Sequence, residues 1–381
     1  MVSRTGSLRD DQEARACPPM FASRRAMLAS GRPAAAAFRA ASILAALTSA
    51  ILLVAGGCGG SFRAAVGPNE DVEVFSDFAG GDARTQLLIE LLTRPVETPV
   101  RAERPFKVLR ADSTSYRQMR DWRNLVLLGN MAGGAWAARQ SRGLLGPEAH
   151  ARLAAKPAGF VILPDASAEG QTMLIVHASS AEALGAMLAQ EGQMLLARFE
   201  DAIVAGLTKT LFLSGEQTEL AAGIAQRHGL HLRIPRDFLV EEDAANRFVR
   251  MKRIVPDEPV TFFFVYYEAQ KLEDEDPRLA TYCIAIRDTL ASAYFGGDRV
   301  DPSRTRAEWV DFQGRRALQL YGLYQNDSPP MGGPFKMYCF HEGGRLYVID
   351  LAVFNPPGNK LPQLRILEAI ARSLRITPGK A

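Results

Sequence analysis

The sequence predicts an α+β fold in which antiparallel sheets pack against helices in two domains. Segments rich in β-branched and aromatic residues, such as Val260–Tyr267, dominate the second half of the chain. Gln313-Gly314 and Gly343-Gly344 separate such segments, and two-residue glycine turns are typical of β-hairpins. Helical apolar stripes precede and follow the hairpins, which is the order expected when helices cover an antiparallel sheet.

The first half alternates short strands with helices. The expected strands are Val72–Phe78, Phe106–Arg110, Asn124–Leu128, Phe160–Leu163 and Thr172–His177. The expected helices are Arg84–Thr93, Ser115–Trp122, a short one near Glu148–Ala155, a long one after Ser179 and one after Ser214. The long helix carries an apolar stripe, which favours a core face over a methionine-lined binding groove. Its members are Leu184, Met187, Leu188, Met194, Leu195, Phe199 and Ile203.

Gly229 should end the helix that follows Ser214, and it is the expected domain boundary. The strands expected beyond it are Leu230–Ile234, Arg247–Arg253, Val260–Tyr267, Ala307–Phe312, Arg315–Tyr324, Phe335–His341 and Arg345–Phe354. The expected helices are Leu279–Phe295 and a terminal one opened by Pro362. We therefore expect a targeting segment at 1–57, a tether at 58–69, an N-terminal domain at 70–228 and a C-terminal domain at 229–376.

The segment Ile43–Ser61, ILAALTSAILLVAGGCGGS, is an apolar run that ends in two glycines and a cysteine. It resembles the lipobox of a bacterial lipoprotein signal, in which small residues admit the peptidase and the cysteine receives the lipid. Arg24 and Arg25 belong to a basic flank upstream of the run, as in secretory signals. We expect cleavage after Gly57, acylation of Cys58, and attachment to the periplasmic face of an envelope membrane.

Two alternatives stay open for this segment. One is an ordinary secretory signal with Cys58 incidental, and the other is an uncleaved anchor, although a run so rich in alanine and glycine is a weak membrane span. Ala55 stands where lipoboxes usually have leucine. The segment before the run is long, so translation starting at Met20 or Met27 instead of Met1 would fit a secretory signal better.

The net charge gives no support for nucleic-acid binding. The chain is formally +3, but residues 1–57 hold seven of the 45 basic residues and three of the 42 acidic ones, which leaves 38 basic and 39 acidic residues beyond them. The basic excess therefore belongs to the targeting segment. Removal of 57 of the 381 residues leaves 324, enough for two domains.

No pattern of residues requires a metal or a cofactor. His228 and His231 are three apart, but Gly229 breaks the helical register that shared ligation needs. Gly129–Gly134 follows an expected strand as a phosphate-binding loop would, yet it has no Lys-Ser/Thr, which favours a plain turn. Cys283 and Cys339 could pair in an oxidising envelope, but their apolar surroundings favour two buried thiols.

Several segments resemble a known family. DFLVEEDAANRFVRMKR (Asp237–Arg253), GRRALQLYGLYQND (Gly314–Asp327) and MGGPF (Met331–Phe335) are similar to an uncharacterised family of bacterial envelope lipoproteins, catalogued only as a domain of unknown function. DWRNLVLL (Asp121–Leu128) and HLRIPRDF (His231–Phe238) are similar to its N-terminal half. The resemblance implies an address and no reaction. The C-terminal half also resembles the β-sandwich with flanking helices of PsbP-like and Mog1-like proteins, which are mostly binding and assembly modules.

Two classes of function remain. The first is a non-catalytic envelope lipoprotein that binds a protein partner or an apolar ligand. The second is an envelope hydrolase with a dispersed acidic active site, because carboxylates far apart in the sequence can converge in the fold. The chain has no G-x-S-x-G, phosphate-binding P-loop or dinucleotide fingerprint, which favours the first class.

The connection Asn326–Phe335, NDSPPMGGPF, is the expected interaction surface. Its glycines allow positive φ and close approach of a partner backbone. Met331 and Phe335 add apolar side chains to a connection expected to run over the surface. The alternative is that both side chains pack inward. The residues expected to make contact are Met331, Gly332, Gly333, Pro334 and Phe335.

Overall fold

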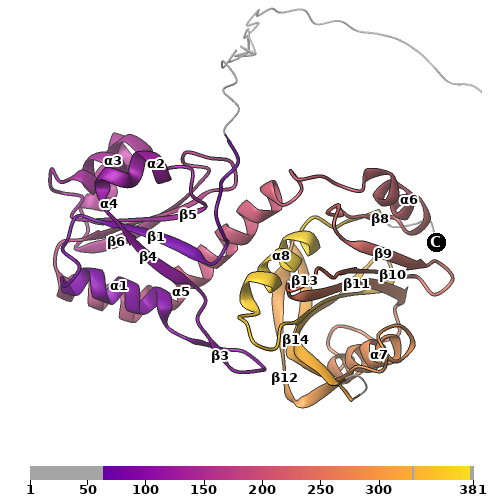
Figure 1. Ribbon diagram of the computed structural model, residues 1–381. Coiled ribbons are helices and arrows are strands. Elements are labelled where there is room, and N and C mark those ends of the chain that lie inside the picture. Colours follow the sequence, from indigo (N-terminus) through magenta and orange to yellow (C-terminus); the bar gives the residue numbers. More distant parts are fainter. Residues whose placement is uncertain (1–62, 328–329, 378–381) are drawn as a thin grey trace, which may run out of the picture. The chain divides into compact units, whose positions relative to one another are not determined.

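The computed structural model describes residues 63–327 and 330–377. They build two large sheets, each with its own hydrophobic clusters (Figure 1). The expected cleavage site and Cys58 lie outside the described residues.

The first sheet has five strands in the order β4-β1-β5-β7-β6. Its strands are β1 (Asp71–Ser76), β4 (Lys107–Ala111), β5 (Asn124–Gly129), β6 (Ala158–Pro164) and β7 (Thr172–Ala178). β4, β1, β5 and β7 run parallel, and only β6 is antiparallel. The expectation of antiparallel sheets is therefore wrong for this half. Helices lie between its parallel strands in the chain and cover both faces, so strands such as β5 are apolar throughout instead of alternating.

Two groups of helices cover the first sheet (Figure 1). α1 (Ala83–Thr93) and α5 (Ala181–Thr210) pack on one face. α2 (Tyr116–Met119), α3 (Trp136–Leu145) and α4 (Pro147–Ala154) pack on the other. The expected helix Ser115–Trp122 shrinks to α2 after a 3-10 turn at Ser113–Ser115, and α3 was not expected. The cap of α5 is Ser180, one residue after the expected Ser179, and its hydroxyl accepts from the Ala183 amide.

The second sheet is antiparallel, with seven strands in the order β12-β13-β14-β15-β11-β10-β9. Its strands are β9 (Leu239–Asp243), β10 (Phe248–Arg253), β11 (Val260–Ala269), β12 (Arg299–Phe312), β13 (Arg315–Asp327), β14 (Pro330–Glu342) and β15 (Arg345–Phe354). The expected glycine turns are confirmed. Gln313 and Gly314 have φ values of 58° and 78°, and Gly343 and Gly344 have 58° and 73°, as hairpin turns of type I′ require.

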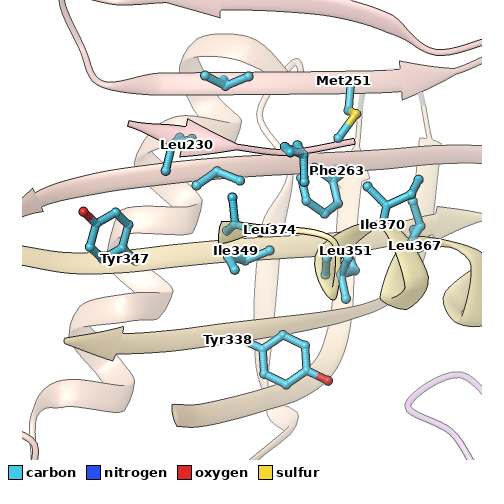
Figure 2. Packing of buried hydrophobic residues seen from close by; sticks show 14 of the residues in the cluster. Leu230, Met251, Phe263, Tyr338, Tyr347, Ile349, Leu351, Leu367, Ile370 and Leu374 are labelled. Carbon is cyan, nitrogen blue, oxygen red and sulfur yellow. The ribbon is translucent and has the colours of Figure 1, made fainter. Parts of the chain in front are cut away.

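Successive side chains of a strand point to opposite faces, so the apolar strands of the second sheet place hydrophobic side chains on both faces. Helices cover each of these two faces. Phe263, Ile349 and Leu351 face the terminal helix α8 (Leu361–Ala371), as Figure 2 shows. α6 (Thr218–His228) contributes to the same cluster, and α7 (Leu279–Tyr294) packs on the opposite face. This helix–sheet–helix sandwich confirms the α+β class. The short pairs β2 (Val96–Glu97) with β3 (Ala102–Glu103) and β8 (Leu230–His231) with β16 (Arg375–Ile376) complete the described elements.

The domain boundary expected at Gly229 stays a prediction. Gly229 ends α6 in the left-handed conformation, with φ of 70°. Ile224, which precedes it on α6, is fully buried in the cluster beneath the second sheet. The described residues belong to one compact unit. A fragment that tests the boundary should therefore be made in two lengths, one starting at Gln217 and one at Gly229.

Candidate functional site

A groove follows α5 where this helix faces α1, α8 and strands β12–β14, and we call it the α5 groove. Its upper part lies between α1 and α5 and encloses about 720 Å³. Its central part has the sheet as its floor, in two adjoining hollows of about 250 and 770 Å³. Val96, Glu97 and Arg306 line both the upper and the central part, so the two are continuous.

Glu368 of α8 lies at the centre of the groove, and its carboxylate has partners on every side. The Tyr338 hydroxyl donates to this carboxylate, whose oxygens lie 2.9 and 2.8 Å away. Arg372 Nε donates from 3.1 Å, and Lys336 Nζ lies at 3.6 Å. Burial alone would raise the pKa of Glu368, but the charges of Lys336 and Arg372 and the hydrogen bonds prevail and lower it. The side chain is therefore a fixed anion at neutral pH.

Ion pairs join α8 to α5 along the wall of the groove. Arg365 Nε donates to Glu200 at 2.7 Å, and Arg372 Nη2 donates to Asp201 at 2.9 Å. The Arg365 guanidinium is buried, and it also donates to the Pro105 carbonyl at 2.7 Å. Removal of one partner from a buried pair leaves an uncompensated charge, which costs about 3–5 kcal/mol. These contacts fix the position of Glu368 above the sheet.

The upper part of the groove differs in its charges. Glu90, Arg94, Glu97 and Arg306 line it, and within residues 63–327 and 330–377 none of the four lies in an ion pair. The other lining residues are mostly apolar and come from α1, α5 and the segment after α1. The groove thus changes from an apolar upper part with unpaired charges to a central part whose buried charges are paired.

A second charged cluster is buried beneath α7. Arg287 Nε of α7 donates to Asp350 Oδ1 at 3.0 Å, and both side chains are 3% exposed. Asp350 lies close enough for its charge to act on Asp298, and burial raises the pKa of both carboxyl groups. Arg287 Nη1, Asp298 Oδ1 and the Tyr324 hydroxyl are buried without a hydrogen-bond partner among the described residues. These two carboxyl groups lie in a core and not across an open cleft.

The glycine-rich stretch Gly129–Gly134 does connect β5 to a helix, α3, as a phosphate loop would. However, the Asp77 carboxylate accepts from the Ala137 amide at 2.8 Å. The chain's own carboxylate thus occupies the N-terminus of α3, the position that a bound anion would take. The expected plain connection is consistent with this geometry.

Residues 326–327 and 330–335 are strand and not surface loop, and that part of the expectation is wrong. β13 and β14 continue through it, pairing Asn326 with Met331 and Gly322 with Phe335. Phe335 is fully buried under α7, with the Arg287 guanidinium 4.6 Å from its ring. Gly333 and Pro334 are buried as well, whereas Met331 and Gly332 stay partly exposed. A Cβ on Gly333 would lie 1.9 Å from the Val353 carbonyl oxygen, so this glycine serves strand packing.

The remaining candidate residues lie apart from the groove. Cys283 and Cys339 are fully buried free thiols in the cluster under α7, and burial raises the pKa of Cys339. His228 contacts the Tyr267 hydroxyl and Glu242, while His231 contacts Thr377. No group of three His, Cys, Asp or Glu side chains in the described part of the chain could hold a metal ion. None of the described helices is both long and apolar enough to span a membrane.

Comparison with known proteins finds a family match in the second half. Residues 217–373 match a family described as a domain of unknown function, DUF4837, which supports the expected domain of unknown function for this region. No curated protein matches the chain.

Three solved structures are similar over about two fifths of the chain. A Bacteroides thetaiotaomicron protein has 10% identity and a TM-score of 0.25, over 39% of this chain and 45% of that chain, so less than half of its length is spanned. Cyanobacterial PsbP from Synechocystis has 13% identity and a TM-score of 0.28, over 40% of this chain and 88% of that chain. LpqN, described as involved in cell envelope biogenesis of Mycobacterium tuberculosis, has 15% identity and a TM-score of 0.25, over 39% of this chain and 83% of that chain. TM-scores this low carry no argument about function.

The sequence analysis did not identify the central residues of the groove, although the spacing of charged residues in the terminal helix could have indicated them. Arg365, Glu368 and Arg372 recur at helical spacing on a terminal helix that is otherwise apolar. Charged side chains that share a face of such a helix must find buried partners. Those partners, Glu200 and Asp201, lie more than 160 residues away in the sequence and became visible only in the fold.

Proposed function

We propose that this chain is an envelope protein, anchored to a membrane by a lipid on Cys58, that binds a partner in the α5 groove without catalysing a reaction. The observation that carries the binding role is the state of Glu368. A general acid or base needs a pKa near the working pH, whereas this carboxylate is held ionised by Tyr338, Arg372 and Lys336. Its arrangement suits recognition and not proton transfer.

Two features support the anchor. The lipobox-like sequence ends at Cys58, and the described fold begins soon after it: the Ala65 amide donates to the Glu169 carbonyl at 2.8 Å. Seven residues span at most about 25 Å. A lipid on Cys58 would therefore keep the folded part close to the membrane surface, where a partner in the same membrane is within reach.

The anchor is tested by the mature N-terminus. Mass spectrometry of the protein from its native envelope should give an N-terminal acylated Cys58, and Cys58→Ser should release the protein or leave the precursor unprocessed. A mature N-terminus at any other residue would contradict the anchor.

The binding role is tested separately by affinity capture from intact envelopes. Lys336→Gln removes a groove cation that is 27% exposed, and Tyr338 and Arg372 still hold Glu368. Lys252→Gln is the matched control, because Lys252 of β10 is also half-buried and lies 3.1 Å from a glutamate. We expect at least a tenfold loss of captured partner for Lys336→Gln alone. Equal capture by both variants would remove the groove from the binding site.

A further inference from the structure

We propose that the upper part of the α5 groove binds a zwitterionic phospholipid, one whose head carries both a phosphate and an ammonium group. This proposal rests on the binding role proposed above and names a ligand for one part of the same groove. It follows from three properties of that part: an apolar wall, room for an acyl chain, and two charges of each sign.

The apolar wall comes from two helices. Leu87 and Leu91 of α1 face Leu188 and Leu196 of α5, and Val96 adds a side chain that is 37% exposed. The enclosed volume of about 720 Å³ falls within the roughly 300–1,000 Å³ typical of small-molecule sites. Burying an acyl chain here would gain about 0.8 kcal/mol for each methylene removed from water.

A glycine provides part of the space. Gly185 of α5 lines the groove, and a Cβ built on it would meet only Leu87 Cδ1, at an ordinary contact distance of 3.8 Å. Gly192, two turns further along, is different, since a Cβ there would lie 3.1 Å from Leu91 Cδ1. Gly192 therefore serves close helix packing, whereas a larger side chain at Gly185 would fill the groove without displacing its backbone.

The charges select the head group. Arg94 and Arg306 can donate to a phosphate, and Glu90 and Glu97 can accept from an ammonium group. All four side chains are exposed and stay hydrated when no ligand is bound. A purely anionic head would place both glutamates near a like charge, and a head with no charge would gain nothing from any of the four. In the central part, Glu200, Asp201 and Glu368 already have cationic partners. Among the described residues that line it, the charges outside ion pairs are Asp311 and the shared Glu97 and Arg306, so two unpaired charges of each sign come together in the upper part alone.

The test uses the full chain carrying Cys58→Ser, so that its own anchor supplies no acyl group. Binding of short-chain phosphatidylethanolamine below its micelle concentration is measured by titration calorimetry and native mass spectrometry. Phosphatidylglycerol of the same chain length has an anionic head, and diacylglycerol has an uncharged one. We expect one molecule of the ethanolamine lipid to bind at least tenfold more tightly than either. Equal affinity for all three lipids, or no binding of the ethanolamine lipid, would overturn the proposal.

Two variants of one residue locate the site. Gly185→Leu should weaken binding at least tenfold, while Gly185→Ala should stay within threefold of the unmodified chain. Both should keep or raise the melting temperature, because glycine is a poor helix former. Undiminished binding by Gly185→Leu would place the lipid elsewhere and contradict the proposal. If the lipid fails to bind but Lys336→Gln still abolishes partner capture, the lipid proposal falls and the proposed function stands.

Discussion

Each face of the second sheet forms an ion pair with a helix, and the helix supplies the cation on one face and the carboxylate on the other. On one face, α7 brings a cation, Arg287, to a carboxylate of the sheet, Asp350. On the other, α8 brings a carboxylate, Glu368, to a cation and a hydroxyl of the sheet, Lys336 and Tyr338. Burial raises the pKa of Asp350, whereas the surrounding charges lower that of Glu368.

The difference teaches what each face can do. The α7 cluster holds two carboxyl groups for one guanidinium, all sealed from solvent, so it positions a helix at an electrostatic cost. The α8 cluster balances Lys336 and Arg372 against Glu368 and Asp201, and it opens into the α5 groove through the two cations, which are 27% and 31% exposed. A partner can reach the second cluster and not the first.

The largest expected loss of stability comes from a substitution on the α7 face, whose charged cluster is sealed from solvent. Arg287→Met should destabilise the protein by about 3–5 kcal/mol, because Asp350 and Asp298 lose their shared cation in a core. Urea unfolding at pH 7 measures this loss. Recovery in the double variant Arg287→Met/Asp350→Asn would confirm its cause. A loss below 1 kcal/mol for the single variant would break the comparison.

A smaller effect is expected on the open face. Glu368→Gln should cost about 1.5–3 kcal/mol, since charge-assisted hydrogen bonds are lost but Lys336 and Arg372 can turn to solvent. The same unfolding measurement applies. If this variant loses more stability than Arg287→Met, the two faces do not differ in solvent access as described.

The contributions of Glu368 and Asp298 to stability should depend on pH with opposite signs. Glu368 has a folded-state pKa below 4.5, so its contribution to stability is present above pH 4.5 and is lost as the pH falls through the folded-state pKa. Glu368→Gln should therefore flatten the loss of stability below pH 4.5. Melting temperatures of both proteins between pH 3 and 7 test this, and parallel curves would contradict it.

The smallest expected effect is a gain in stability on substitution of Asp298. The folded-state pKa of Asp298 lies above 3.8, so its contribution is greatest below pH 3.8 and is lost as the pH rises through that pKa. Asp298→Asn removes this excess buried charge and should slightly raise the melting temperature at pH 7, with the gain vanishing toward pH 3.8. A drop at pH 7 would show that the interactions of this carboxylate with Arg287 and Asn326 outweigh the cost of burying its charge.

Local patterns were enough to predict much of the second half. β-branched runs gave β11 and β15, and the turns at Gln313-Gly314 and Gly343-Gly344 gave the hairpins, because their pairing is between neighbours in the chain. β9 was missed because its sequence, LVEED, is acidic at an edge of the sheet. The extension of β13 and β14 through Met331–Phe335 was missed because two prolines and two glycines resemble a turn.

The first half and the groove depended on contacts that no local pattern records. The parallel pairing of β1 with β5 joins segments about fifty residues apart. α3 was missed because its buried face is formed by small residues such as Ala137, Ala138 and Ser141 and not by large apolar side chains. The pairing of Arg365 with Glu200 likewise required the fold.

The most direct test of the account is photo-crosslinking in intact cells from two positions on opposite faces of this sheet. A photoreactive residue at Gln319 lies on the floor of the groove, and one at Ala285 lies exposed on α7. We expect the photoreactive residue at Gln319 to capture a discrete partner, the one at Ala285 to capture none, and Lys336→Gln to abolish the capture. Capture from Ala285 alone, or capture from Gln319 that Lys336→Gln leaves unchanged, would contradict it.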